Sequence, residues 1–362
     1  MKFINIFLLL LFKTKYVFLR PKKSKILLYD QGKTFNQMIK NTLNTKKDIS
    51  VMYVRLEEVN LYVLFSCVVK FRLFNSNKIF FNYLVEYCRI VNPRWIVTST
   101  HYDLKFFRLR EVLKDSSKFI IVQCMPAYKN HFKHFEKKYS VDAVFCYDSY
   151  SKKIYAKKIR ANYIKIGSFK NNFYPVEKNK KNCDILLISG FKDNFLKQKK
   201  IPLDGLDLNH EKKLTNYLIE YSASKDLKFK ILLKPDIKKD GYINFNNISK
   251  KYLINNTSGN PYSVMDKSAL ILISNYSAMS FEAAARGLKH ALIVKHKHPK
   301  NKFYKDNFFT YKKEIKSSSG KIFLDNLFIQ SKKNFFLNYK KAGYQAIFDK
   351  KNKTFKSFIN NN

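Results

Sequence analysis

The chain has few cysteines and no residue pattern typical of a metal site. Its 362 residues include five cysteines, an odd number scattered along the sequence without a CxxC pair. The seven histidines form no HExxH motif or comparable helical pair, so we expect no metal. Because most of the cysteines have apolar neighbours, we expect them to be buried free thiols in a reducing compartment.

Acidic residues are scarce as well. There are 27 Asp and Glu against 70 Lys and Arg, which gives a formal net charge of +43. Such a charge suits nucleic acid, an anionic membrane surface or a phosphate-bearing substrate. The abundance of Lys, Asn, Ile, Phe and Tyr is also what A- and T-rich coding produces, and we attribute the larger share of the charge to it. The sequence has no RGG tract, zinc-finger spacing or RNP-like aromatic motif, which argues against nucleic acid as a partner.

The sequence also lacks an apolar run long enough to cross a membrane as an ordinary helix. Phe3 to Phe12 (FINIFLLLLF) is too short. Basic residues follow it in place of a small-residue cleavage site, so we do not expect a secretory signal peptide. These basic residues are Lys13, Lys15, Arg20, Lys22, Lys23 and Lys25. We expect residues 1–24 to lie in the interface of an anionic membrane, with the lysines near head groups. The alternative is a helix packed on the protein's own core.

The chain does contain ample core material, arranged in two similar halves. Hydrophobic residues make up 46% of it, with 24 Tyr and 33 Phe, and its length is comfortable for two domains. Alternating strand and helix patterns over residues 25–167, including a helix over Asn60–Arg72, predict one Rossmann-like doubly wound domain. A polar, basic linker with Pro175 occupies 168–182, and a second alternation covers 183–330, with strands expected at Cys183–Ile188 and Tyr252–Ile254. Residues 331–362 are expected to form a C-terminal helix and tail. The predicted fold class is α/β, with two Rossmann-like domains facing a cleft.

Acidic and histidine side chains follow two predicted strands of the first domain. Glu57 and Glu58 come after the second strand, and His101 and Asp103 come after the third. In open parallel sheets, ligands bind outside the carboxyl ends of the strands, so these four residues are candidates for proton abstraction. Glu58 ranks first among them. Alternatively, Glu57 and Glu58 are first-turn residues that interact favourably with a helix dipole.

A serine-rich turn is the central feature of the second half. The apolar run at 270–273 predicts a strand, Ser274 to Ser280 a turn, and the following alanine-rich segment a short helix. Backbone N–H groups at such a turn can face an anion, and Ser277 or Ser280 is the expected N-cap. Gly287 fits the helix C-terminus, where a positive φ is favoured. Spacing alone fits equally well an ordinary βαβ unit whose serines only cap the helix.

The turn, together with Glu282-Ala283 and Gly287, resembles the donor-nucleotide motif of GT-B glycosyltransferases. The resemblance implies that the turn holds the nucleotide diphosphate and that Glu282 hydrogen-bonds the ribose. By position, the diphosphate roles fall on Ser277, Ala278, Met279 and Ser280, and Ser274 at the start of the turn is a further candidate for binding the donor nucleotide. Lys234, after a predicted strand, is either a further phosphate ligand or a solvated surface lysine. The chain departs from many family members at Leu288-Lys289, where they have a proline.

The order of several segments resembles a narrower group, the bacterial surface carbohydrate biosynthesis proteins. These segments are KILLYD, RLEEVNLY, NPRWIVTSTHYDLKFFRLR, YIKIGSFKNN and YSVMDKSALILISNYSAMSFEAAARG, and they extend over most of the chain up to Val294. The chain departs from this group at Leu56, where a glycine is usual, and at Gln123-Cys124-Met125, where a glutamine with asparagine and glycine is usual.

This second resemblance implies a glycosyltransferase of surface polysaccharide synthesis. Its substrates would be a nucleotide sugar and a glycan or lipid-linked acceptor, with no further cofactor. It would act in the cytoplasm, on the inner face of the cytoplasmic membrane. Other readings stay open: a nucleotide-sugar 2-epimerase, a teichoic-acid-type glycerophosphotransferase, a non-enzymatic membrane-associated scaffold, or a basic RNA-binding protein.

Overall fold

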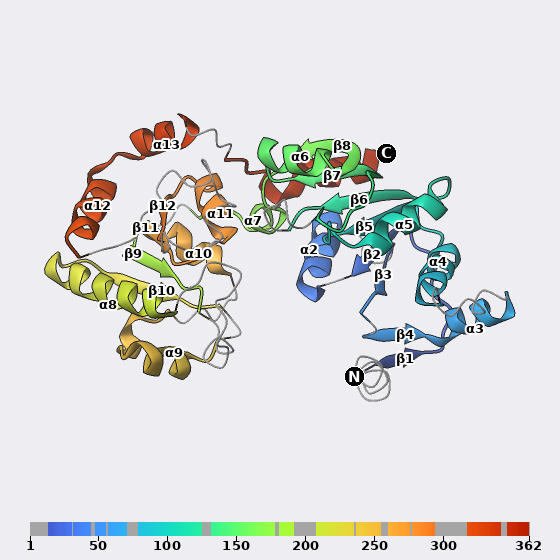
Figure 1. The fold of residues 1–362 in the computed structure, drawn as a ribbon, viewed down its shortest axis with the longest axis horizontal. Coiled ribbons are helices and arrows are strands. Elements are labelled where there is room, and N and C mark those ends of the chain that lie inside the picture. The colour runs from blue at the N-terminus through green and yellow to red at the C-terminus, as the bar shows by residue number, and fades with distance from the viewer. Residues whose placement is uncertain are drawn as a thin grey trace. The chain divides into compact units, whose positions relative to one another are not determined.

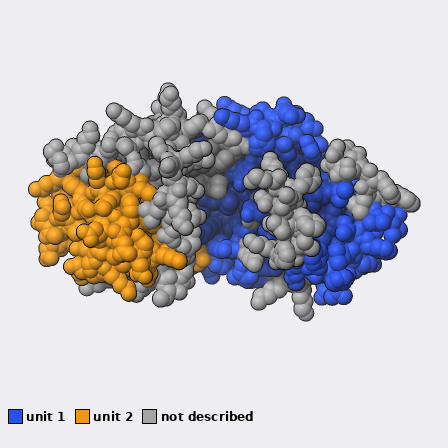
Figure 2. Space-filling model, turned by 60° about the horizontal axis from the view of Figure 1, so that its bottom comes forward, with its two compact units in different colours: residues 1–173, 349–362 blue, residues 174–348 orange. Residues whose placement is uncertain are grey.

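The computed structural model divides the chain into two compact units. Unit 1 comprises residues 1–173 and 349–362, and unit 2 comprises residues 174–348 (Figures 1 and 2). The structure describes residues 14–30, 32–44, 48–55, 57–70, 79–124, 132–177, 181–191, 208–234, 237–254, 260–275, 277–293, 317–341 and 346–361. The apolar segment Phe3 to Phe12 therefore lies outside the described residues. Each unit is an α/β structure with a parallel sheet, which confirms the predicted fold class at this level.

Unit 1 contains a six-stranded parallel sheet in the order β3-β2-β5-β6-β7-β8. Its strands are β2 (Ile26–Asp30), β3 (Ile49–Tyr53), β5 (Trp95–Thr98), β6 (Lys118–Val122), β7 (Tyr139–Cys146) and β8 (Ile159–Lys165). Its helices are α2 (Lys33–Leu43), α3 (Leu61–Val69), α4 (Ile79–Val91), α5 (Leu104–Leu113), α6 (Ser149–Ala156), α7 (Phe169–Phe173) and α14 (Lys353–Asn361). The chain runs from β2 outward to β3 and then returns to β5 on the other side of β2. The strand order therefore reverses between β2 and β5, which is where such sheets bind ligands.

The sheet of unit 1 is buried on both faces, as parallel sheets usually are. All four residues of β5 are buried, from Trp95 to Thr98. The C-terminal helix α14 covers part of one face. Its Phe358 ring lies 5.7 Å from Trp95, and its Phe355 ring lies 5.1 Å from Phe145, between ring centroids. Residues 349–362 therefore complete the core of unit 1.

Unit 1 also contains a small sheet that the sequence did not predict. Strand β1 (Lys15–Val17) pairs in parallel with β4 (Glu58–Asn60), and α3 follows β4 directly. The Asn60 side chain caps α3 by accepting the N–H of Val63 at 3.1 Å. The helix predicted over Asn60–Arg72 is present, but its described part ends at Val69.

Unit 2 contains four parallel strands in the order β10-β9-β11-β12. They are β9 (Cys183–Ile188), β10 (Phe229–Leu232), β11 (Ser268–Ile273) and β12 (Lys289–Leu292). The helices are α8 (Leu208–Ser224), α9 (Lys239–Asn246), α10 (Pro261–Asp266), α11 (Met279–Ala285), α12 (Ser317–Ile329) and α13 (Lys332–Lys341), with the 3-10 helix η4 (Lys250–Tyr252). Figure 1 shows α8 beside β9 and β10, and α11 beside β11 and β12. Here the strand order reverses between β9 and β11.

One prediction for unit 2 is wrong, and one helix of this unit was not predicted. The strand expected at Tyr252–Ile254 is replaced by η4 and a single bridge between Leu253 and Ile231, so the apolar pattern there reflects packing at a sheet edge. Helix α12 was not predicted, because its first turn is SSSG and no regular apolar period precedes it. Its Leu324 and Leu327 are fully buried in the core of the unit, so tertiary packing stabilises a helix that local propensity does not indicate.

The chain passes between the units twice, and in each unit one side chain contacts both connecting segments. The division falls after α7, whereas the sequence placed it after Gly167. In unit 1, the Asn172 amide donates to Asn352 Oδ1 at 3.1 Å and accepts the N–H of Asp349. In unit 2, the guanidinium of Arg286 holds both connecting segments.

The Arg286 side chain is completely buried and lies at the centre of this anchor. It forms a bidentate ion pair with Asp266, with Nε 2.7 Å from Oδ1 and a second guanidinium nitrogen 2.5 Å from Oδ2. It also donates to the carbonyls of Tyr174 and Pro175, and it lies 5.8 Å from the centroid of the Phe348 ring. One side chain therefore contacts the chain where it enters unit 2 and where it leaves.

Candidate functional site

In unit 2, two short loops meet at the carboxyl edge of the sheet where the strand order reverses. Ser189 and Gly190 follow β9, and Ser274 and Asn275 follow β11. The loops lie so close that a Cβ atom added to Gly190 would be 2.7 Å from Cγ of Asn275. Glycine is therefore required there by close approach. This edge is the position at which open α/β sheets bind ligands.

A buried glutamate connects these two loops. Glu211, near the start of α8, is fully buried. The Ser274 hydroxyl donates to its Oε2 at 2.9 Å and accepts the Gly190 N–H at 2.9 Å. The Ser189 hydroxyl donates to Oε1 of the same carboxyl group. Burial raises the pKa of Glu211, and the hydrogen bonds from the serines partly offset this. Ser274, predicted to bind the donor, therefore fixes the geometry of the edge through its hydroxyl.

The serine turn that follows is partly exposed and satisfies two of its own amides. Ser277 Oγ accepts the N–H of Met279 at 3.3 Å, and the Ser277 carbonyl accepts the N–H of Ser280 at 3.3 Å. The N-cap position of α11 is occupied by Ala278, whose backbone is already helical, and the hydroxyl of Ser277, one of the two predicted cap residues, accepts the N–H of Met279 from one position earlier. The positive φ predicted for Gly287 is confirmed at 69°.

The remaining unit 2 candidates lie on the same edge but differ in exposure. Ser277, Ala278 and Met279 are half-buried, whereas Ser280 and Glu282 are buried. Lys234 follows β10 and is half-buried. Because β10 and β11 both flank β9, their ends are separated by two strand spacings, roughly 10 Å. The structure thus brings Lys234 to the same edge as the serine turn, on the other side of β9.

In unit 1, Asp103 lies where the strand order reverses between β2 and β5. Its Oδ1 accepts the N–H of Lys105 at 3.0 Å, which makes Asp103 the N-cap of α5. Its Oδ2 accepts the hydroxyl hydrogen of Tyr29, from the neighbouring strand β2, at 2.7 Å. Burial, together with the Asp103 charge, raises the pKa of Tyr29, so the phenol stays protonated. Asp103 therefore has a structural function that does not depend on catalysis.

The other three candidates of unit 1 occupy different environments. His101 is fully buried, with its ring centroid 5.2 Å from that of Tyr155. Glu57 is exposed, and its carboxylate accepts the N–H of Arg55 at 3.2 Å. Glu58 begins β4 and pairs with the exposed Lys15 at 3.4 Å. The structure thus brings His101 and Asp103 to one loop and the two glutamates to the small sheet.

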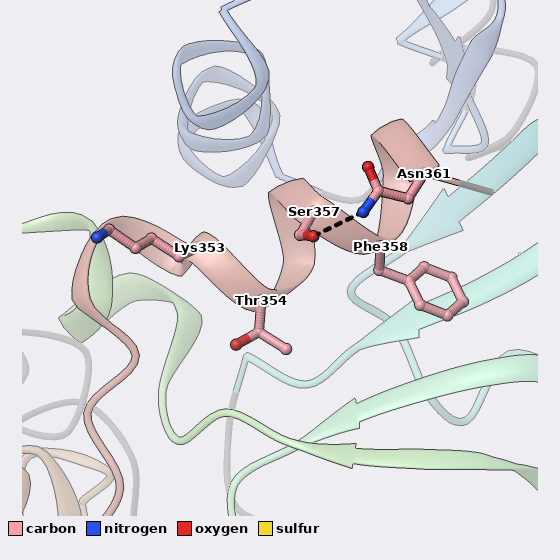
Figure 3. Close-up of a pocket in the computed structure, with 5 residues that line it drawn as sticks. All are labelled: Lys353, Thr354, Ser357, Phe358 and Asn361. Atoms are coloured by element: carbon pink, nitrogen blue, oxygen red, sulfur yellow. Dashed lines mark hydrogen bonds between the residues drawn. The ribbon is translucent and has the colours of Figure 1, made fainter.

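Other features of the described residues bear on the predicted chemistry. All five cysteines are free, and four of them are buried. Within the described ranges, no group of three His, Cys, Asp or Glu side chains could hold a metal ion. In that same part of the chain, no helix is long and apolar enough to cross a membrane. A surface hollow along α14 is lined by Lys353, Thr354, Ser357, Phe358 and Asn361 (Figure 3). Its lining comes from one helix and contains no acid, so it offers no group for acid-base chemistry.

Two of the residues that organise these edges were not identified from sequence. Glu211 lies in an otherwise ordinary amphipathic helix, and its partners are 22 and 63 residues away in sequence. Tyr29 lies inside an apolar strand, where nothing local indicates a buried phenol paired with an acid. The sequence signal that could have indicated this part of the site is Ser189-Gly190, two small residues directly after a buried strand.

The two parallel α/β units, each with a strand reversal, have the fold of GT-B glycosyltransferases. Two solved structures of the wall teichoic acid polymerase TagF match over 94% of this chain and 89% of theirs, with a TM-score of 0.50 and 12% and 13% identity. At this identity the likeness concerns the fold alone. A structure of TarM from S. aureus is more distant, with 13% identity and a TM-score of 0.40 over 73% of this chain and 54% of its own. No curated protein matches the chain.

Residues 125–362 match the family model described as "putative O-antigen biosynthesis protein". The chain belongs to this family of proteins, which is associated with the synthesis of a surface glycan. The match confirms the resemblance to surface carbohydrate biosynthesis proteins predicted from the sequence.

Proposed function

We propose that the protein transfers a sugar from a nucleotide-activated donor to a growing surface glycan, with the donor in unit 2 and the acceptor in unit 1. The proposal rests on one observation above the others. In a member of an O-antigen biosynthesis family, the serine turn follows β11 at the strand reversal of unit 2. That edge is where an α/β sheet of this kind accepts a nucleotide.

The donor would lie along the exposed part of the serine turn. Ser277, Ala278 and Met279 offer backbone and hydroxyl groups to the diphosphate, and a phosphate oxygen could replace the long, 3.3 Å bond from Met279 N–H to Ser277 Oγ. Glu282, in the first turn of α11, would accept a ribose hydroxyl. Lys234, from the far side of β9, would offset the charge of the departing nucleotide diphosphate.

A carboxylate of unit 1 would take the proton of the acceptor hydroxyl as this hydroxyl attacks the anomeric carbon. Glu58 stays first among the candidates, because its carboxylate is partly accessible and pairs with an exposed lysine at 3.4 Å. Glu57 is exposed, Asp103 is held by Tyr29 and the α5 backbone, and His101 is enclosed by rings. These three are the weaker candidates. We place the reaction at the cytoplasmic face of the membrane, where a lipid-linked acceptor would be reached.

A panel of nucleotide sugars tests the donor site. A ligand present at about 100 times its Kd stabilises the native state by about 2.7 kcal/mol, which a thermal melt detects. We expect one nucleotide class to raise the melting temperature, and Glu282→Ala to abolish that rise. Glu220→Ala, an exposed glutamate on α8, is the matched control and should behave as the parent. Equal stabilisation of Glu282→Ala and the parent by every nucleotide sugar would contradict the ribose role.

Product analysis tests the reaction itself. Incubation with the stabilising donor and a lipid-linked acceptor should give a longer glycan, and Glu58→Gln should reduce the rate by at least a hundredfold. Unchanged turnover in both Glu58→Gln and Asp103→Asn would exclude this acid-base assignment. Conversion of the donor without any acceptor would indicate an epimerase, and incorporation of glycerol phosphate would indicate a phosphotransferase.

A further inference from the structure

We propose that α3 and β1 form a surface of unit 1 that docks on an anionic lipid bilayer. This docking face comprises residues 15–23 and 61–70. Large exposed apolar side chains gather on it: Tyr16, Phe18, Leu19, Tyr62, Phe65, Val68 and Val69. Phe18 is 71% exposed, Leu19 is 80% exposed and Phe65 is 67% exposed. Such a concentration of exposed apolar side chains on a small area marks a contact surface.

Helix α3 has two distinct faces, which explains the exposure. Val63 and Cys67 are buried, and Ser66 donates to the buried carboxylate of Glu86 on α4 at 2.8 Å. This face packs on unit 1. Tyr62, Phe65, Val68 and Val69 follow at helical spacing on the opposite side and are exposed. A helix this apolar on its outer face is costly in water unless another apolar phase covers it.

The segment after β1 lies beside α3 and extends the docking face. The Asn60 side chain donates to the carbonyl of Leu19 at 2.9 Å, and the guanidinium of Arg20 lies 5.9 Å from the centroid of the Tyr62 ring. Figure 1 shows β1, β4 and α3 together at one end of unit 1. The two apolar segments, distant in sequence, therefore form one continuous surface.

The charges around this surface identify the occupant. The segments 14–25 and 61–70 contain six cations and no acid. These cations are Lys15, Arg20, Lys22, Lys23, Lys25 and Lys70, all exposed, of which Lys15 pairs with Glu58 and Lys70 with Glu86. Exposed apolar side chains bordered by basic groups match the head groups and upper acyl region of an anionic bilayer. A second copy of the chain would bring the same cations face to face, so self-association is electrostatically disfavoured.

The docking face also lies next to the first-ranked base. Glu58 forms part of β4, which pairs with β1, and its carboxylate meets Lys15 of the face. A protein bound through this face would hold that carboxylate near the lipid surface. Lipid binding through this face does not depend on the proposed sugar transfer.

Vesicle sedimentation of the full chain tests the proposal. The parent should bind vesicles of phosphatidylcholine with phosphatidylglycerol, and added salt should weaken this binding. The double variant Phe65→Ser/Val69→Ser should bind at least about tenfold more weakly, because each lost side chain removes apolar area from the contact. Val112→Ser, a 48% exposed valine on α5, is the matched control and should bind like the parent.

The basic border and the depth of insertion need separate measurements. Lys22→Gln/Lys23→Gln should weaken binding, whereas Lys152→Gln/Lys153→Gln on α6 should not. For insertion, Phe65→Trp adds an exposed tryptophan to a chain whose single native one, Trp95, is 1% exposed. Its emission should shift to shorter wavelength on anionic vesicles.

Three results would overturn the inference. The first is parent-like binding by the folded Phe65→Ser/Val69→Ser variant, which would leave residues 1–13 as the sole anchor. The second is an unshifted emission of Phe65→Trp on vesicles that bind the protein. The third is a concentration-dependent dimer that the double variant abolishes while vesicle binding is retained. Thermal melts of each variant establish that it is folded.

Discussion

Replacing Glu211 by glutamine should change how the stability of the protein depends on pH. Glu211 is fully buried, and burial raises its pKa above the ordinary 4.5. At low pH the parent holds a neutral carboxylic acid there, which an amide resembles in shape and hydrogen bonding. Near pH 4, the free energy of unfolding should therefore differ by only about 1 kcal/mol between Glu211→Gln and the parent.

The difference should shrink as the pH rises. A carboxyl group whose pKa is raised in the folded state gives its full stabilisation below the unfolded pKa, and this is lost as the pH rises through the folded pKa. Between the two pKa values, the parent loses about 1.4 kcal/mol for each pH unit, because the unfolded chain ionises while the buried acid does not. The glutamine variant has no such loss, so it should approach and then exceed the parent in relative stability.

Urea denaturation at several pH values from about 4 to 8 measures this effect. Glu220→Gln, on the exposed face of the same helix, controls for loss of a negative charge and should follow the parent at every pH. A stability difference between Glu211→Gln and the parent that stays constant over this range would refute the reasoning. Such a result would mean that the hydrogen bonds from the serines lower the pKa of Glu211 as much as burial raises it.

Three further predictions concern packing and ionisation. Arg286→Met should lower the free energy of unfolding, measured by the same denaturation assay, by about 3–5 kcal/mol, because it leaves the buried Asp266 carboxylate without its ion pair. The control Arg110→Met removes the partly exposed ion pair with Asp142 and should lower the free energy of unfolding by about 1 kcal/mol or less. Burial lowers the pKa of His290 from 6.5 to about 4, so the free energy of unfolding should fall by up to about 3 kcal/mol as the pH drops through this interval. His290→Gln should reduce this dependence of stability on pH, and an unchanged dependence in the variant would contradict the prediction. Gly190→Ala should lower the free energy of unfolding by about 1–3 kcal/mol, because the added methyl group overlaps the Asn275 side chain. The control Gly32→Ala, with no atom within 4 Å of the added methyl group, should be close to neutral. Similar melting temperatures of the two variants would argue against the close approach of Gly190 and Asn275.

The sequence predicted the elements whose signal is local. Buried parallel strands are short apolar runs, and β9 was predicted with the bounds Cys183–Ile188 that the structure shows. The positive φ at Gly287 follows from the end of a helix and a glycine, and it too was predicted. By contrast, the bridge at Leu253 and the helix α12 depend on neighbours that are remote in sequence. Local patterns are therefore sufficient for the alternation of strands and helices, but not for elements at the margins of a sheet.

The candidate site divides in the same way. The serine turn after β11 could be located, because a strand, small residues and a short helix follow each other directly. The function of Ser274 could not, since its hydroxyl meets a carboxylate 63 residues away in sequence. Likewise, Asp103 resembled a possible base from its position after a strand, and only the structure shows the Tyr29 hydroxyl 2.7 Å from it. Sequence indicates which residues reach an edge, and packing determines which of their atoms are already engaged.

The placement of α14 in unit 1 affects the order in which the protein can fold during synthesis. The ribosome releases residues 353–361 only after all of unit 2 has been made, and domains otherwise tend to fold as they emerge. Until then, Trp95 and Phe145 lack the phenylalanine rings that cover them in the finished protein. The nascent first unit therefore exposes an aromatic surface throughout the synthesis of the second, which is the period when it is most open to chaperones and to aggregation.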